Sequence, residues 1–345
     1  MTPASAHTPS APTRRRLLTA AGGLAVAPLL AACGSDAASP RSKSGESTGI
    51  WTFKDDRGRT VRLGKRPERI VAFVSTAAAL HDYGVECTGV FGPSKPVDGK
   101  PSPQAGTLDV SKLTSVGQAW GEFGIEAYAK LDPDLLVSNM FPAPDLWFVP
   151  QESLKKIEAL APTVGISVAR ASLLQPLRRT AELAESLGAD LAARQATAAK
   201  ARFERAAETL RQAARANRGL KVLAMTGDPD NMYVAVPGAY CDLAYFKELG
   251  VEFVEGKKSD EWGFWEFLSW ENAGKYRADL IMIDNRSTSM QAEDLAKKPT
   301  WRGLPAVKAG QTVPWSMEER HSYAGYAPVL ERLAAAITGA KRLPA

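Results

Sequence analysis

The sequence predicts an α/β protein of two lobes joined by one long helix. Short apolar runs of strand length alternate with helical segments along most of the chain, which favours parallel sheets. One segment, residues 172–216, has almost no strand signal. The length of 345 residues is enough for two domains of roughly 100–200 residues each, and 45% hydrophobic with 23% charged side chains is typical of a globular protein.

Residues 1–32 have the pattern of an export signal. Arg14, Arg15 and Arg16 precede an apolar run over 17–32, which is rich in Gly and Pro and shorter than the ~20 apolar residues that span a bilayer. Paired arginines followed by two leucines resemble a twin-arginine signal, whose cargo is exported folded. The alternative is a buried apolar helix.

The end of this segment resembles a bacterial lipobox, Leu30-Ala31-Ala32-Cys33. In that pattern cleavage precedes the cysteine, which then receives lipid. We therefore expect a twin-arginine-like lipoprotein signal peptide over 1–32, lipidation at Cys33, and a flexible tether over 33–49 that is rich in Ser, Gly and Ala. The mature protein would be anchored by lipid to the extracytoplasmic face of the cell membrane.

The mature chain is nearly neutral. Removing residues 1–32 leaves 40 basic and 38 acidic residues, a net charge of +2 in place of +5. No basic stripe remains that would indicate a nucleic-acid partner. Besides Cys33 there are two cysteines, Cys87 and Cys241, which we expect to be buried free thiols in different lobes, a disulfide between the lobes being the alternative.

The first lobe is predicted over residues 50–188. Segments 51–53 and 60–63 flank the turn residues Asp55-Asp56-Arg57-Gly58 and predict a hairpin, and the apolar run 70–74 predicts a buried parallel strand. A helix over 76–83, closed by Gly84, follows it. Further strands are expected at 85–91, 135–137, 163–166, 222–225, 233–236 and 280–283, and helices at 151–160, 239–249 and 326–337.

A connector helix is predicted over residues 189–217. A first helix ends at about Leu187 and is capped by Gly188, and a second runs from Asp190 to near Ala216. Its apolar residues keep to one face because they are three or four positions apart. At 1.5 Å per residue the second helix is roughly 40 Å long, enough to cross between domains. The second lobe then covers 218–345.

Four short stretches resemble, in the same order, the binding proteins of iron-siderophore, haem and cobalamin ABC importers. They are residues 55–61 with 66–71, residues 125–137, residues 161–164 and residues 278–283. The resemblance covers essentially the whole mature chain. It implies two Rossmann-like α/β lobes joined by one rigid helix, the class III periplasmic-binding-protein fold, in a monomer.

The resemblance also implies function. Such a protein captures a ferric siderophore outside the cell and delivers it to an ABC permease, whose ATPase subunit drives uptake. Haem and cobalamin are alternative ligands in the family. A member of the family can also act as a signalling receptor that presents the ligand to a membrane sensor. Glu126 and Glu271 match the surface glutamates that dock on permease arginines. The alternative interpretation is that Glu126 and Glu271 are ordinary solvent-exposed helix charges without a docking role.

Aromatic side chains gather in loops at the predicted strand ends, where open α/β sheets bind ligands. We expect the ligand to be bound by Trp120, Phe141, Trp147, Tyr233, Trp262, Trp265, Trp315, Tyr323 and Tyr326. Arg286 directly follows a strand, where its guanidinium could donate two hydrogen bonds to hydroxamate or carboxylate oxygens, or else pair with Asp284. Some hydroxamate binders have an arginine where this chain has Gln118-Ala119-Trp120.

An aromatic cleft with few charges suits a nearly neutral ferric trihydroxamate, whereas a ferric tricatecholate would require several basic residues. The siderophore itself satisfies the coordination of iron, so we expect no protein ligand to metal and no cofactor. For haem, His321 and Tyr323 are the residues that could approach the iron.

An exported enzyme is the alternative of a different class. The sequence has no Gly-x-Ser-x-Gly elbow, no His-Glu-x-x-His pair, no glycine-rich phosphate loop and no Cys-x-x-Cys. We therefore expect no catalytic residues.

Overall fold

The computed structural model describes residues 49–96, 101–257 and 260–344. Residues 47–345 form one compact unit, to which every described element belongs. The predicted signal peptide, nearly all of the tether and Cys33 lie outside the described residues. No helix in the described part of the chain is long and apolar enough to cross a bilayer.

The first lobe is built on a hairpin and a parallel sheet of five strands. The hairpin pairs β1 (Trp51–Lys54) with β2 (Thr60–Leu63), and Gly58 takes a φ of 78° in the turn between them. The sheet has the order β5-β4-β3-β6-β7. Its strands are β3 (Ile70–Phe73), β4 (Gly89–Phe91), β5 (Thr114–Ser115), β6 (Leu135–Met140) and β7 (Thr163–Ser167).

The strand order of this sheet reverses direction between β3 and β6. Open α/β sheets bind ligands outside the carboxyl ends of the strands at such a reversal. The helices of this lobe are α1 (Val74–Asp82), α2 (Ile125–Lys130), α3 (Gln151–Leu160) and α4 (Leu174–Ser186), with short 3₁₀ turns η1 (Pro103–Ala105) and η2 (Val110–Lys112). The reversal therefore places the loop that follows β6 at the predicted position of a ligand.

The connector is α5 (Arg194–Ala216), 23 residues or roughly 35 Å long. It begins four residues later than predicted because the Asp190 carboxylate accepts a hydrogen bond from the backbone N–H of Ala192 at 2.9 Å, which makes a turn there. Gly188, after α4, takes a φ of 98°, as its predicted capping role requires.

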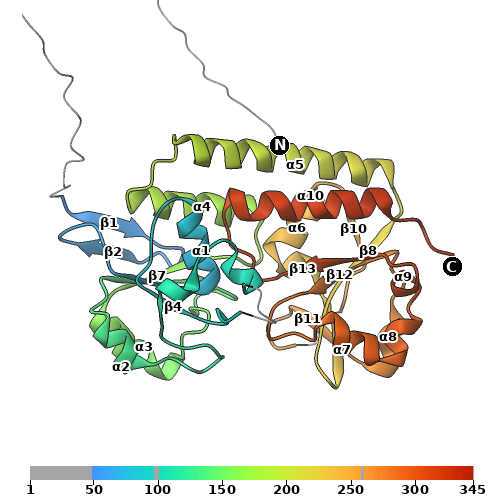
Figure 1. Ribbon diagram of the computed structural model, residues 1–345, viewed down its shortest axis with the longest axis horizontal. Helices are drawn as coiled ribbons and strands as arrows, with labels where there is room; N and C mark the ends of the chain where they lie inside the picture. Colours follow the sequence, from blue (N-terminus) through green and yellow to red (C-terminus); the bar gives the residue numbers. More distant parts are fainter. Residues whose placement is uncertain (1–48, 97–100, 258–259, 345) are drawn as a thin grey trace, which may run out of the picture. The chain divides into compact units, whose positions relative to one another are not determined.

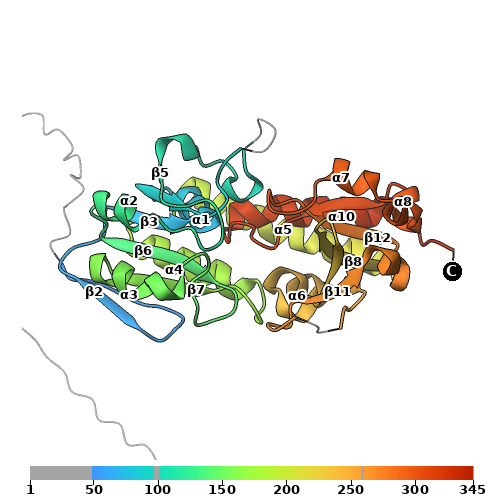
Figure 2. The same cartoon turned by 90° about the horizontal axis from the view of Figure 1, so that it is seen from below.

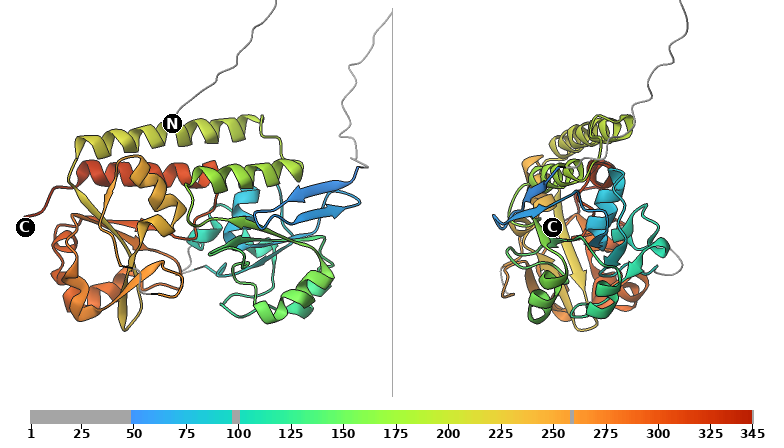
Figure 3. Two further views of the ribbon diagram at one scale, coloured as in Figure 1. Left: turned by 180° about the vertical axis from the view of Figure 1, so that it is seen from behind. Right: turned by 90° about the vertical axis from the view of Figure 1, so that its left-hand side faces the viewer.

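Helix α5 packs along α10 (Tyr323–Gly339) and extends over α4 (Figures 1 and 3). Its buried face includes Phe203, Ala206, Leu210 and Ala213, which lie on the predicted apolar stripe. Helix α10 starts three residues before the predicted 326–337 because Ser322 caps it, accepting from the Gly325 N–H at 2.9 Å. The connector is thus held mainly by the last helix of the chain.

The second lobe has a mixed sheet of order β11-β9-β8-β12-β13, with β10 paired to β8. Its strands are β8 (Lys221–Gly227), β9 (Asn231–Ala235), β10 (Glu252–Phe253), β11 (Trp265–Ser269), β12 (Leu280–Asp284) and β13 (Thr312–Trp315). The prediction of a parallel sheet is wrong for β9 and β11, which run antiparallel. Three residues join β8 to β9, too few for the crossover that a parallel pair needs.

The remaining elements of this lobe are short. They are η3 (Pro237–Ala239), α6 (Cys241–Glu248), η4 (Trp270–Lys275), α7 (Ala292–Lys297), α8 (Pro299–Gly303) and α9 (Pro305–Lys308). Figure 2 shows the two lobes side by side, each with strands between helices.

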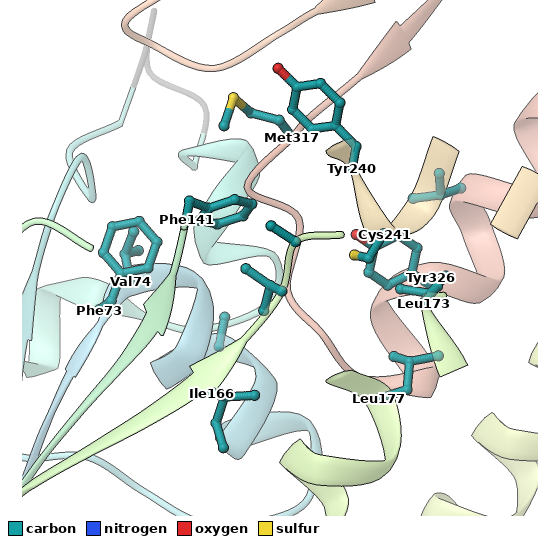
Figure 4. Close-up of a cluster of buried hydrophobic side chains, with 14 of the residues drawn as sticks. Phe73, Val74, Phe141, Ile166, Leu173, Leu177, Tyr240, Cys241, Met317 and Tyr326 are labelled. Carbon is teal, nitrogen blue, oxygen red and sulfur yellow. The ribbon is translucent and has the colours of Figure 1, made fainter. Parts of the chain in front are cut away.

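The lobes meet through backbone contacts and a shared apolar cluster. Ala169 and Tyr240 form an isolated antiparallel bridge, and the Leu173 N–H donates to the Cys241 carbonyl at 3.0 Å. Figure 4 shows side chains of both lobes in this cluster, among them Ile166 of β7 and Tyr326 of α10. Cys87 and Cys241 are buried and free, as expected. Because the core is continuous across the boundary, wide separation of the lobes would expose apolar surface.

Candidate ligand-binding site

A pocket with a cavity volume of about 350 Å³ lies between the lobes. It is lined by Phe141, Trp147, Asp260, Glu261, Trp262, Phe264, Trp265, Phe267, Arg286 and Met317. A neighbouring pocket of about 280 Å³ shares Phe141, Trp147 and Trp262 and adds Trp120. Together they bring six predicted residues to one place, namely Trp120, Phe141, Trp147, Trp262, Trp265 and Arg286.

The wall from the first lobe is the loop after β6. Phe141 directly follows the carboxyl end of this strand, and its ring centroid lies 5.3 Å from that of Trp147. The strand holds the loop, because the Trp147 N–H donates to the Asn139 carbonyl at 2.8 Å and the Ser138 hydroxyl donates to the Trp147 carbonyl at 2.8 Å. Phe141 lies near Met317 of the second lobe, which lines the same pocket (Figure 4).

Three tryptophans meet at the rim. Trp120 and Trp147 of the first lobe have ring centroids 4.6 Å apart, and Trp262 of the second lobe lies 6.5 Å and 6.2 Å from them. Trp120 is 58% exposed and Trp262 is 44% exposed, so both are accessible to an entering solute. Arg170 of the first lobe donates to the Trp262 carbonyl and lies 5.1 Å from the Phe264 ring centroid.

The wall from the second lobe is organised by Asp260. Its carboxylate accepts from the backbone N–H groups of Trp265, at 2.6 Å, and Trp262, at 3.2 Å, which fixes the start of β11. Trp265 and Phe267 are two positions apart on this strand, so their side chains lie on the same face, and both line the pocket. Tyr233, a predicted ligand-binding residue on β9, is paired across the strands with Phe267 and packs its ring 4.8 Å from the Phe267 ring, on the same face of the sheet but outside the pocket lining.

Arg286 lies at the carboxyl end of β12 between two carboxylates. Its Nε and Nη2 atoms donate to Asp284, the latter at 2.6 Å, and its Nη1 donates to Glu318 at 2.5 Å. Burial lowers the pKa of Arg286, but the two carboxylates outweigh it and hold that pKa above its usual value. Among the described residues that line the pocket, Arg286 is the one cation, beside Asp260 and Glu261.

Four predicted residues do not line either pocket, namely Tyr233, Trp315, Tyr323 and Tyr326, and the placement of the last three in the pocket is corrected by their burial. Trp315 is only 2% exposed, and its Nε1 donates to the buried Asp242 carboxylate at 2.7 Å behind Trp265. Tyr326 is fully buried, and Tyr323 packs its ring 5.4 Å from that of Phe203 on α5. Trp315 and Tyr326 are buried and Tyr323 is half-buried because the chain turns after β13 into α10, which packs along α5.

The residues expected to approach a haem iron are also away from the pocket. His321 is buried, and burial lowers its pKa to about 3. Its Nε2 lies 3.5 Å from the Cys241 sulfur. His321 and Tyr323 therefore belong to the packing of the lobe boundary. No group of three His, Cys, Asp or Glu side chains that could hold a metal is found within the described residues.

Glu126 and Glu271 are both exposed. Glu126 lies in the first turn of α2 and Glu271 in the first turn of η4, one on each lobe.

Sequence reasoning did not single out Asp260, Glu261, Phe267 or Met317. Phe267 is two positions after Trp265 on one strand, so the two side chains share a face; this spacing is the signal that could have identified Phe267. Glu318 has no such local signal, because its contacts come from segments distant in the chain.

Comparison with known proteins shows the family. A family model described as "Periplasmic binding protein" matches residues 71–316. A curated relative, the iron(3+)-hydroxamate-binding protein FhuD of Bacillus subtilis (strain 168), is 24% identical over 289 residues, covering 81% of this chain and 84% of that protein. The Fe(3+)-citrate-binding protein YfmC of the same organism is 22% identical over 283 residues, covering 82% and 84%.

Among solved structures, DesE, a ferric-siderophore receptor protein from Streptomyces coelicolor, is 50% identical with a TM-score of 0.82. The match covers 85% of this chain and all of that chain. The chain therefore belongs to the periplasmic binding protein family, has the two-lobed class III fold of its siderophore-type members, and is a substrate-binding protein and not an enzyme.

Proposed function

We propose that this chain is an extracytoplasmic, lipid-anchored binding protein that captures a ferric siderophore of the trihydroxamate type and delivers it to an ABC permease for iron uptake. The observation that carries the proposal is the pocket between the lobes, which has aromatic walls and a single, charge-compensated arginine.

The shape of the pocket supports a compact chelate. Its two parts, of about 350 and 280 Å³, share ring-lined walls, and the larger part is within the range of small-molecule sites. Aromatic rings can pack against the apolar linkers of a trihydroxamate. Two N–H groups of Arg286 remain beyond those given to Asp284 and Glu318, enough to donate to hydroxamate oxygens.

The charge of the pocket disfavours an anionic ligand. Arg286 is compensated by Asp284 and Glu318, and Asp260 and Glu261 add negative charge. A ferric tricatecholate carries a net negative charge and would meet like charges there. A nearly neutral chelate would meet no such penalty.

Relatives support an iron chelate as the ligand. DesE is a ferric-siderophore receptor and FhuD binds iron(3+)-hydroxamate, and both match more than four-fifths of this chain. Haem is not favoured, because His321 and Tyr323 lie outside the pocket.

Delivery would use the exposed carboxylates of Glu126 and Glu271, one on each lobe, as contacts for permease arginines. Exposed ion pairs contribute only about 0–1 kcal/mol each, so these contacts would orient the complex more than strengthen it. Lipidation at Cys33 would keep the protein near the permease.

The test is intrinsic tryptophan fluorescence of residues 34–345 titrated with ferric trihydroxamates, a ferric tricatecholate, haemin and cobalamin. Quenching that saturates below micromolar concentration with a trihydroxamate alone is the expected result. Quenching only by haemin or cobalamin would overturn the ligand class, and no response to any of the four would overturn the function.

A further inference from the structure

Glu318 belongs to the segment 316–322, which links β13 to α10 and lies against the first lobe. Met317 of this segment lines the pocket, and Arg320 donates to Asp82 of α1 at 2.8 Å. Glu318 lies between these two contacts and is 1% exposed. This segment of the second lobe therefore both lines the ligand pocket and contacts the first lobe.

The Glu318 carboxylate joins three side chains from the two lobes. Its Oε1 accepts from Arg286 Nη1 of the second lobe at 2.5 Å and from Trp147 Nε1 of the first lobe at 3.1 Å. Its Oε2 accepts from Gln104 Nε2 of the first lobe at 2.7 Å. Arg286 and Trp147 both line the pocket, on walls that belong to different lobes.

The first-lobe side of this link is itself held in place. Gln104 is fully buried, and its Oε1 accepts from the Ser102 hydroxyl at 2.9 Å, which orients the amide group toward Glu318. Hydrogen bonds to a charged acceptor are stronger than neutral ones, and they gain strength in a buried setting. Loss of the carboxylate would leave the Trp147 and Gln104 N–H groups without this acceptor.

Neutralising Arg286 does not require Glu318. Asp284 alone binds the Nε and Nη2 edge of the guanidinium through both of its oxygens. The contribution specific to Glu318 is geometric, since among the described residues its carboxylate is the one that hydrogen-bonds pocket-lining side chains of both lobes at once.

We propose that Glu318 is a positioning residue that fixes the two walls of the pocket relative to each other before a ligand arrives. Backbone and apolar contacts hold the lobes together, and this buried carboxylate adds to them by setting the ligand-free spacing of the two pocket walls and the orientation of Arg286 and Trp147. The effect on affinity rests on the proposed function, whereas the effect on spacing does not.

The first measurement is the distance between the lobes in the ligand-free protein. Spin labels are attached at Lys130→Cys on α2 and Arg302→Cys on α8, both exposed, in residues 34–345, while the native cysteines of this chain are buried. Double electron–electron resonance should give a narrow distance distribution for the parent protein. Glu318→Ala should broaden it, and Glu318→Gln should broaden it less because an amide oxygen still accepts.

The matched control is Glu331→Ala. This substitution also removes a carboxylate paired with an arginine, Arg202 at 2.6 Å, but on the exposed faces of α10 and α5. It should leave the distribution unchanged. If Glu318→Ala does not fold, as judged by circular dichroism, Glu318→Gln carries the test.

The second measurement is the Kd for ferrichrome, a neutral ferric trihydroxamate. Glu318→Gln should raise the Kd at least tenfold, and Glu331→Ala should leave it unchanged. A wild-type protein that binds no chelate would overturn the proposed function but leave the distance test in force. A distance distribution identical to that of the parent in both Glu318 variants would refute the inference, whatever the affinities.

Discussion

Asp242 is a buried carboxyl group without a cation to compensate it, and this makes stability depend on pH. It lies in the first turn of α6, where it accepts hydrogen bonds from Trp315 Nε1 at 2.7 Å and from the Leu243 N–H at 2.8 Å. No described residue forms an ion pair with it. Burial raises the pKa of Asp242 from 3.8 to about 7, and the charge of the nearby Glu319 acts in the same direction.

The size of the effect follows from the shift. A change of roughly 3 pKa units corresponds to about 4 kcal/mol between the protonated and ionised forms. Because the folded state holds this proton more tightly than the unfolded state, the favourable contribution is fully present below pH 3.8. It is lost as the pH rises through about 7.

The substitution Asp242→Asn removes the ionisation. The amide offers one acceptor oxygen in place of two, which costs about 1 kcal/mol for a lost hydrogen bond. The variant should therefore be about 0.5 kcal/mol less stable than wild type at pH 4, because the unfolded-state carboxyl is already about half ionised there, and about 3 kcal/mol more stable at pH 9.

Thermal unfolding followed by circular dichroism from pH 4 to pH 9 tests this expectation. The difference in Tm between variant and wild type should change sign across that range. Asp230→Asn, an exposed change in the same lobe, serves as the control for replacing an Asp by Asn. A variant that is less stable than wild type at both ends of the range would refute the reasoning.

Three further predictions concern binding, delivery and location. Replacing Glu126 and Glu271 together by Arg should abolish siderophore-dependent iron uptake by cells and leave the Kd unchanged; weaker binding would contradict the docking role. Arg286→Lys keeps the positive charge but loses the planar guanidinium, so the Kd for a ferric trihydroxamate should rise about tenfold, or about 1.4 kcal/mol, in a fluorescence titration. An unchanged Kd would exclude a direct contact. Cys33→Ala should move the protein from the membrane fraction to the soluble fraction, and retention on membranes would argue against lipidation at that residue.

Much of the pocket could be predicted because strand ends are visible in a sequence. Phe141 and Arg286 each come within four residues of the end of an apolar run, and the carboxyl ends of parallel strands lie at one edge of a sheet. Trp147 and Trp262 are in the loops that continue from such ends or lead to the next strand. Their convergence in one pocket agrees with that reasoning.

Reasoning from strand ends failed for aromatic residues that are buried between elements and do not line the pocket. Trp315 also follows a strand pattern, yet its ring is enclosed between Trp265 and Tyr240 and its N–H is bound to Asp242. A loop aromatic that lines a pocket and one that packs between lobes have the same sequence signature. The strand β9 was predicted, but its antiparallel direction was not, since that depends on the short turn between it and β8.

The sequence by itself determined the alternation of strands and helices, the connector helix and the positions at which aromatic loops begin. These properties depend on the periodicity of neighbouring residues and on turn and cap residues, which act over a few positions. Tertiary structure alone decided which aromatic rings face the pocket and which carboxylates, Asp242 and Glu318 among them, are buried. Burial and hydrogen bonding are set by segments far apart in the chain, as between Gln104 and Glu318, and no local pattern records which distant segments will meet.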